Sequence, residues 1–153
     1  MKTTTILSGL MGILFIGAAN AADINIYYSP TCPHCHHARE FISSELIYVY
    51  NDLNVTQIDV TNPEHQQEFM DTLKKCEYES GGVPVLVIGD KCFQGYADSM
   101  QGELREAIEI DLTDEQKQSA KDNKAAFDAD KEAFVAAHAD RTSAIVEREV
   151  KKN

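Results

Sequence analysis

Hydrophobic and polar positions near the start of the chain alternate in a way that predicts strands separated by a helix. Residues 23–29 (DINIYYS) and 54–60 (NVTQIDV) alternate and are rich in Ile, Val and Tyr, which is typical of strands. Between them, a helix is predicted to begin at Cys32 or Pro33, since proline suits a first helical turn, and to end near Tyr50. Its apolar face is predicted to consist of Ala38, Phe41, Ile42, Leu46 and Val49.

A second helix is predicted after the second strand. Asn62 and Pro63 are typical of a helix cap and a first helical turn, and the segment that they begin runs to Cys76. Its buried stripe is predicted to consist of Phe69, Met70 and Leu73.

The following segment predicts a β-hairpin and a third helix. The apolar run 83–88 and residues 91–94 flank Gly89-Asp90, a tight-turn signal. The third helix is predicted over residues 98–110, with Leu104, Ala107 and Ile108 facing inward. The element order over residues 23–110 is therefore β-α-β-α-β-β-α. Helices between the first strands imply parallel pairing and the closing hairpin implies antiparallel pairing, which together predict an α/β fold.

The composition changes after Leu112. Residues 113–116 (TDEQ) form a capping box, and the chain from there on contains no Gly or Pro and is rich in Ala, Lys, Asp and Glu. Residues 112–153 are therefore predicted to be a charged helical extension of a domain that spans 22–111. Its sizeable apolar residues are Phe127, Phe134, Val135, Ile145 and Val150. This extension is interpreted either as a solvated tail that packs on the domain or as a helix that forms a homodimer or docks a partner.

The first 21 residues have the pattern of a secretory signal peptide. Lys2 precedes an apolar run from Ile6 to Ala18, and residues 19–21 (ANA) match a cleavage site, so cutting is expected before Ala22. A membrane anchor is disfavoured, because the run is shorter than the roughly 20 residues that span a bilayer. We therefore expect a periplasmic or otherwise secreted protein that is not inserted in the membrane after cleavage.

Charge and cysteine content narrow the functional classes. The chain has 14 Lys and Arg against 25 Asp and Glu, a formal net charge of −11, which argues against binding to nucleic acid. It has four cysteines, and an even number in an exported protein indicates disulfides.

Residues 32–37 (CPHCHH) carry the most distinctive chemistry. Three interpretations fit this cluster: a redox dithiol, a haem attachment site of the type C-x-x-C-H, and a zinc or copper(I) site built from Cys32, Cys35 and one of the three histidines. The dithiol is favoured, because Cys32 follows a strand at the start of a helix, where backbone N–H groups stabilise a thiolate. Cys35 lies one turn later, and His34 between them favours the reduced form, which makes the disulfide a stronger oxidant.

The order strand–CPHC–helix, followed by residues 81–98 (GGVPVLVIGDKCFQGYAD), resembles the thioredoxin superfamily, and most closely its glutaredoxin-like members. The resemblance covers residues 23 to about 110 and implies a thioredoxin-like fold of the glutaredoxin type. It also implies that Pro84 is a cis-proline opposite the dithiol, leaving the Val83 backbone to pair with an extended substrate. The tetrapeptide itself resembles that of Dsb-type periplasmic oxidants, but no room exists between Val60 and Val83 for their large helical insertion.

The resemblance implies roles for individual residues. Cys32 would be the attacking thiolate and Cys35 the resolving thiol, with Pro33 and His34 completing the catalytic segment. The residues expected to contact substrate are Tyr28, Val83, Pro84, Gly95, Tyr96 and Asp98.

Gly95 and Asp98 match the segment with which glutaredoxins hold glutathione, whereas Tyr96 and Ser99 depart from it. Asp98 is alternatively a helix cap. No prosthetic cofactor is implied, and glutathione is a candidate co-substrate.

Cys76 and Cys92 are expected at the end of the sheet far from the dithiol. A structural disulfide between them is the leading interpretation, with a second redox pair or two free thiols as alternatives. Taken together, the residues and the resemblance predict an exported thiol–disulfide oxidoreductase that acts on protein or small thiols with a redox partner protein. The alternative is a metal-binding or partner-docking module on the same fold.

Overall fold

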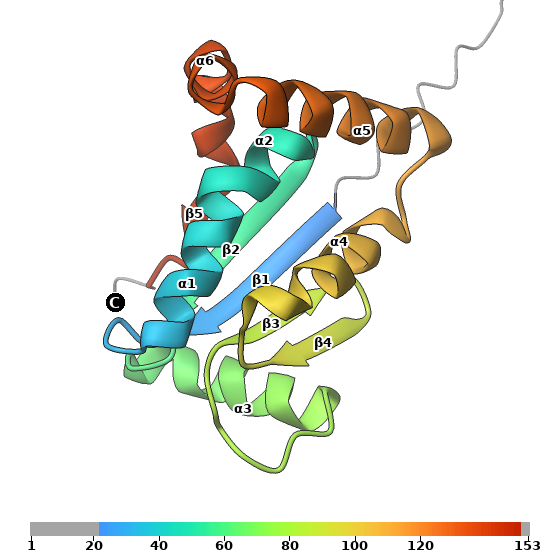
Figure 1. The fold of residues 1–153 in the computed structure, drawn as a ribbon. Helices are drawn as coiled ribbons and strands as arrows, with labels where there is room; N and C mark the ends of the chain where they lie inside the picture. Colours follow the sequence, from blue (N-terminus) through green and yellow to red (C-terminus); the bar gives the residue numbers. More distant parts are fainter. Residues whose placement is uncertain (1–21, 151–153) are drawn as a thin grey trace, which may run out of the picture.

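The computed structural model describes residues 22–150 as a five-stranded mixed sheet with helices on both faces (Figure 1). The elements in chain order are β1 (Ala22–Tyr28), α1 (Pro33–Phe41), a π-helical stretch (Ile42–Leu46), α2 (Ile47–Val49), β2 (Leu53–Asp59), a 3₁₀ turn (Pro63–His65), α3 (Gln66–Lys75), β3 (Val85–Ile88), β4 (Lys91–Gln94), a 3₁₀ turn (Asp98–Met100), α4 (Gln101–Glu109), α5 (Asp114–Ala129), α6 (Lys131–Ala137), a 3₁₀ segment (Ala139–Ala144) and β5 (Ile145–Glu147). The predicted signal peptide lies outside the described residues. Within residues 22–150, no helix combines the length and the apolar character needed to cross a membrane.

The strand order β4-β3-β1-β2-β5 confirms the predicted α/β fold. β1 runs parallel to β2 and antiparallel to β3, and β3 and β4 form the predicted hairpin. Figure 1 shows α1, α2 and α4 on one face of the sheet and α3 on the other. Two buried clusters follow from this layering, a larger one under α1, α2 and α4 and a smaller one under α3.

The predicted helices are present, with two local differences. The helix that begins at Pro33 continues through the π-helical stretch to Val49, and its end is buried from Leu46 to Tyr50. In α3, Phe69 and Leu73 are buried as predicted, but Met70 is 60% exposed, so its place in the buried stripe is wrong. Successive residues are rotated by about 100° around a helix, which turns Met70 away from the face that carries Phe69.

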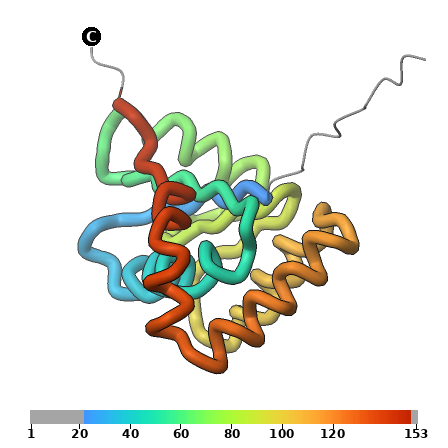
Figure 2. Tube along the Cα trace, turned by 90° about the horizontal axis from the view of Figure 1, so that it is seen from above, coloured from blue at the N-terminus to red at the C-terminus, as the bar shows by residue number. Residues whose placement is uncertain are grey.

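The C-terminal extension is helical only in part. The capping box at residues 113–116 starts α5, as predicted. Residues Ile145–Glu147, however, form a strand that pairs in parallel with β2, so the prediction of helices alone is wrong here. Three residues are too few to show alternation, and the strand forms because β2 has a free edge to pair with. Figure 2 shows the extension turning back across the molecule to reach that edge.

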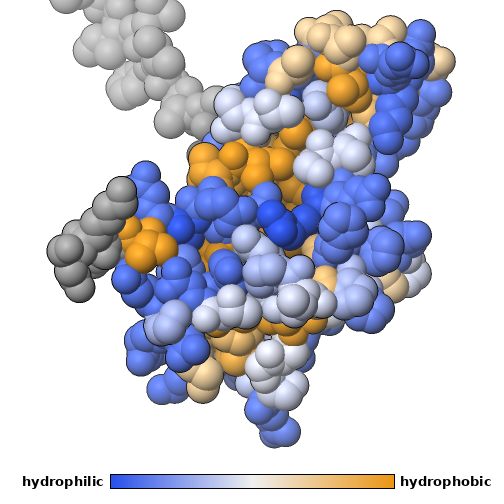
Figure 3. All heavy atoms as spheres, turned by 90° about the vertical axis from the view of Figure 1, so that its left-hand side faces the viewer, coloured by the Kyte–Doolittle hydropathy of each residue, from blue (hydrophilic) through white to orange (hydrophobic). Residues whose placement is uncertain are grey.

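Hydrophobic contacts dock the extension on the domain. Phe127 of α5 is only 4% exposed, and its ring lies 6.4 Å from that of Tyr48 and 6.1 Å from that of Phe134. On the face drawn in Figure 3, hydrophobic residues reach the surface in patches among hydrophilic ones. The exposed large apolar side chains of the described residues are Met70, Ile110, Val146 and Val150.

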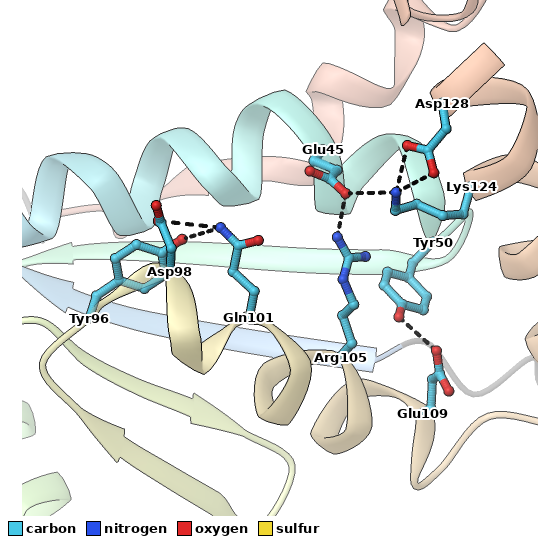
Figure 4. Close-up of polar contacts among 9 residues, drawn as sticks. All are labelled: Glu45, Tyr50, Tyr96, Asp98, Gln101, Arg105, Glu109, Lys124 and Asp128. Carbon is cyan, nitrogen blue, oxygen red and sulfur yellow. Dashed lines mark hydrogen bonds and ion pairs between the residues drawn. The ribbon is translucent and has the colours of Figure 1, made fainter. Parts of the chain in front are cut away.

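Ion pairs join α4 and α5 to the π-helical stretch (Figure 4). The Arg105 guanidinium of α4 pairs with Glu45, and the Lys124 ammonium of α5 lies 3.6 Å from the same carboxylate. Tyr50 donates a hydrogen bond to Glu109 at 2.8 Å, and burial, with this neighbouring carboxylate, raises the pKa of Tyr50. Partly exposed pairs of this kind contribute about 0–1 kcal/mol each, so burial of Phe127 is the larger contribution.

We predict that Phe127→Ala lowers the free energy of unfolding by about 3 kcal/mol, because it removes a buried aromatic ring and leaves a cavity. Chemical denaturation of the full chain would measure this loss. Met70→Ala removes an exposed side chain and should cost about 0.5 kcal/mol or less. If the two variants lost equal stability, the docked extension would not unfold cooperatively with the domain, and this prediction would be wrong.

A disulfide joins Cys76, the residue that caps the C-terminus of α3, to Cys92 of β4, with Cα atoms 5.8 Å apart. Figure 1 shows the end of α3 and the β3–β4 turn on the side of the molecule opposite the start of α1. The expected pairing is therefore present, and it lies away from the Cys32–Cys35 pair.

We predict that Cys76→Ser/Cys92→Ser lowers the free energy of unfolding by about 3 kcal/mol, as the chain-entropy model gives for a loop of about 15 residues. Denaturation under non-reducing conditions measures the difference. The matched double variant Cys32→Ser/Cys35→Ser opens a bridge with a sequence separation of only 3, against 16, and should lose less. An unchanged stability without Cys76 and Cys92 would contradict a structural role for their disulfide.

Candidate active site

The CPHC segment lies where β1 ends and α1 begins. After β1, the chain turns back on itself so that the Cys32 N–H donates a hydrogen bond to the Ser29 carbonyl at 3.1 Å. Cys32 is the cap residue of α1, and it forms a disulfide with Cys35 in the first turn, with Cα atoms 5.2 Å apart. Cys32 is partly exposed, whereas Cys35 is 1% exposed. A substrate can therefore reach the sulfur of Cys32, and Cys35 faces that sulfur from within the protein.

The start of α1 favours negative charge on the Cys32 sulfur. The Cys35 N–H donates a hydrogen bond to Cys32 Sγ at 3.1 Å, and the helix dipole points its positive end at the same atom. The first turn of α1, which is fully described, contains no acidic residue. In the reduced protein, these features stabilise a thiolate at Cys32, the form that attacks disulfides.

Pro33 occupies the first helical position of α1, and His34 follows it; both are exposed. His36 and His37 are exposed on the next turn, with ring centroids 6.0 Å apart in an edge-on arrangement. In the described part of the chain, no three His, Cys, Asp or Glu side chains gather in a group that could hold a metal ion.

The peptide bond between Val83 and Pro84 is cis, as the resemblance implied. This bond lies beside the dithiol, because Cys32 Sγ is 3.6 Å from the Val83 carbonyl oxygen. Pro84 is buried and Val83 is partly exposed. The Val83 backbone is thus next to the reachable sulfur, where an extended chain bound to it would place a disulfide against Cys32.

Tyr28 is largely covered by neighbouring side chains. The ring is only 7% exposed, because the Arg39 guanidinium of α1 lies over it, 4.0 Å from the ring centroid. Its hydroxyl donates a hydrogen bond to Glu147 of β5 at 3.1 Å, and burial, with the Glu147 carboxylate, raises the pKa of Tyr28. The extension and Arg39 therefore cover most of Tyr28, and its expected contact with substrate stays a prediction.

Tyr96 is also part of the packed interior. Its ring is 6% exposed and lies 6.1 Å from that of Phe41, and burial raises the pKa of the phenol. Figure 4 shows the Gln101 side chain directed at the Tyr96 hydroxyl, to which it donates a hydrogen bond at 3.0 Å. The expected contact between Tyr96 and substrate likewise stays a prediction.

Gly95 contacts the backbone beside the dithiol, whereas Asp98 lies just before α4. The Gly95 N–H donates a hydrogen bond to the Pro84 carbonyl at 2.8 Å, and its φ of 81° is one that glycine adopts readily. Asp98 is exposed and begins the 3₁₀ turn before α4, where its carboxylate accepts a 3.4 Å hydrogen bond from Gln101. Ala97 is the cap residue of that turn and makes no side-chain cap bond, so the alternative of Asp98 as the cap is wrong.

Two contacts near the site were not anticipated. Gln94, the last residue of β4, donates hydrogen bonds to the Ser80 and Gly82 carbonyls of the loop before Pro84. Glu147 of the extension accepts hydrogen bonds from Arg39 of α1 and from Tyr28. Gln94 lies within residues 81–98, which carry the family resemblance, but the resemblance assigned it no role, and Glu147 lies in no motif, so the sequence carried no signal for these contacts.

Two comparisons with known proteins found similar proteins. Residues 24–93 match the family model Glutaredoxin. Among solved structures, the glutaredoxin grx-1 from Archaeoglobus fulgidus is 27% identical, with a TM-score of 0.44, and the match covers 66% of this chain and 98% of that one. A comparison with curated proteins found no match. Over residues 24–93, which run from β1 to β4, this chain is therefore similar to the glutaredoxin family, and it carries a Cys-x-x-Cys pair at the start of α1.

Proposed function

We propose that this protein is an exported thiol–disulfide oxidoreductase that exchanges disulfides with protein thiols through Cys32 and Cys35. The observation that carries the proposal is the setting of Cys32, a partly exposed residue at a helix N-terminus, with Cys35 buried behind it and the Val83 carbonyl 3.6 Å from Cys32 Sγ. Such a setting suits a nucleophile whose partner attacks only after the substrate is bound.

The reaction proceeds in two exchanges. The Cys32 thiolate attacks one sulfur of a substrate disulfide, breaks that S–S bond and releases one substrate thiolate, which takes up a proton. The Cys35 thiolate then attacks Cys32 Sγ, forming the protein disulfide and releasing the second substrate thiolate. The substrate gains two electrons and the protein loses two, and the same steps in reverse oxidise a substrate dithiol.

We further propose that the net direction is oxidation of substrate thiols. His34 is exposed between the two cysteines, where a positive or hydrogen-bonding group stabilises the reduced form and makes the disulfide more oxidising. Export, which the pattern of residues 1–21 supports, brings the protein to a compartment where disulfides persist. Protein substrates are favoured over glutathione, because Tyr96 and Ser99 replace residues of the glutathione-holding segment and Tyr96 is buried.

We predict that Cys35→Ser accumulates a mixed disulfide with substrate on Cys32, because no resolving thiol remains. Non-reducing electrophoresis followed by mass spectrometry of the adduct would locate the bond. Cys32→Ser should abolish exchange, and the double variant should form no adduct. Turnover by Cys32→Ser, or an adduct on Cys76 or Cys92, is the outcome that rejects the proposal.

We predict that His34→Ala makes the redox potential of the Cys32–Cys35 pair more negative by about 30 mV, which corresponds to the loss of about 1.4 kcal/mol of stabilisation of the reduced form. Equilibration in glutathione buffers, with alkylation and mass analysis of each cysteine pair, measures the potential. His37→Ala, which removes an exposed imidazole outside the dithiol ring, is the matched control and should shift it less. A potential that stays constant or rises in His34→Ala would contradict the assigned role.

A further inference from the structure

We propose that Gln94 is a positioning residue for the exchange reaction: its amide holds the loop that presents the Val83 backbone to the substrate. This inference rests on the proposed function, since it assumes that a substrate binds along Val83 and reacts at Cys32. Gln94 itself is not placed against the reacting sulfur, so it would act through the loop.

The loop that joins α3 to β3 needs such a restraint. It runs from Glu77 to Pro84, and its residues 79–82 are all exposed. Gly81 and Gly82 directly precede Val83, and two consecutive glycines give a chain great conformational freedom. The Val83 carbonyl nevertheless has a defined place, 3.6 Å from Cys32 Sγ.

Gln94 supplies the restraint with a single amide group. Its Nε2 donates one hydrogen bond to the Ser80 carbonyl at 2.8 Å and another to the Gly82 carbonyl at 3.0 Å, which uses both amide hydrogens. Gly82 lies close enough that a Cβ added there would be 3.5 Å from the same nitrogen. The bonded carbonyls lie on either side of Gly81, so this flexible stretch is tied down immediately before Val83.

The strand that carries Gln94 anchors the loop along its length. Gln94 pairs with Val85, and the next residue, Gly95, holds the Pro84 carbonyl. Cys92 lies two residues before Gln94 and therefore on the same face of β4, and its disulfide holds Cys76, the residue directly before the loop. The disulfide thus fixes the start of the loop, Gln94 its middle and the β3–β4 pairing its end.

The test is Gln94→Glu, which preserves the shape of the side chain but removes both donors and brings carboxylate oxygens against two carbonyl oxygens. The substrates are an extended synthetic peptide joined to an aromatic thiol through its single cysteine, and the symmetric disulfide of the same aromatic thiol. With either one, the reduced protein becomes the Cys32–Cys35 disulfide and the substrate is released as two thiols, at least one of them the coloured aromatic thiol. The reaction is followed as a single turnover with substrate in excess over the protein, so that KM is the half-saturating substrate concentration and kcat the limiting rate.

We predict that Gln94→Glu raises KM for the peptide about tenfold while kcat stays within about twofold, the pattern of lost binding rather than lost chemistry. The rate with the small disulfide should not change, because that molecule has no backbone to pair with Val83. The matched control is Gln118→Glu on α5. It alters a surface amide away from the loop, which donates to Asp122 at 3.0 Å, and it should leave both rates unchanged.

A Gln94→Glu protein with the wild-type KM for the peptide would overturn the inference, as would an equal loss with both substrates, which would indicate damage to the dithiol. Hydrogen exchange provides a second measurement, and amides 80–83 should exchange faster in Gln94→Glu while those of β1 do not. Unchanged exchange in the loop would also overturn it. A wild-type protein that is inactive toward both substrates would reject the proposed function itself. That outcome differs from the one that rejects only the role of Gln94, in which the wild type is active and Gln94→Glu is equally active.

Discussion

The antiparallel pairing of β1 with β3 is the constraint on which the rest of the structure depends. In this register, Tyr27 lies opposite Val85, so β1 ends and β3 begins at the same end of the sheet. Cys32 follows β1 and Pro84 directly precedes β3. The pairing of β1 with β3 therefore brings these distant parts of the chain into contact. A different register would separate the reactive sulfur from the backbone beside it, even with every helix in place.

The C-terminal extension is integrated with this sheet. Phe127 is buried against Tyr48 at the end of the first helix, and β5 occupies the edge that β2 would otherwise leave unpaired. Pairing of an exposed edge removes backbone groups that could template association with other chains. Glu147 then connects the extension to Arg39 of the helix that carries the dithiol, so tail and active site share a structural element.

Around the dithiol, the groups positioned to react or to bind substrate differ from those that stabilise the surrounding structure. The groups that can react with or bind substrate are the Cys32 sulfur and the Val83 backbone. The nearby aromatic residues Tyr28 and Tyr96 are buried and stabilise the elements around the site. Recognition through backbone needs a loop of defined position more than it needs particular side chains. The polar contacts of Gln94 and the disulfide at Cys76 meet that requirement from outside the reacting centre.

The features that the sequence determined by itself arise from local backbone preferences. The helix start at Cys32 and Pro33, the capping box at residues 113–116 and the turn at Gly89 follow from backbone preferences of a few neighbouring residues, and they appear in the structure as predicted. Resemblance to a family added the cis bond before Pro84.

The tertiary structure alone decided the features that depend on distant partners. Ile145 joins the sheet because β2 offers an edge, Tyr96 is buried because Phe41 lies beneath it, and Gln94 meets the loop because β4 brings it there. A polar or aromatic residue has much the same local preference in either setting, so its burial and partners are fixed only when the chain has packed.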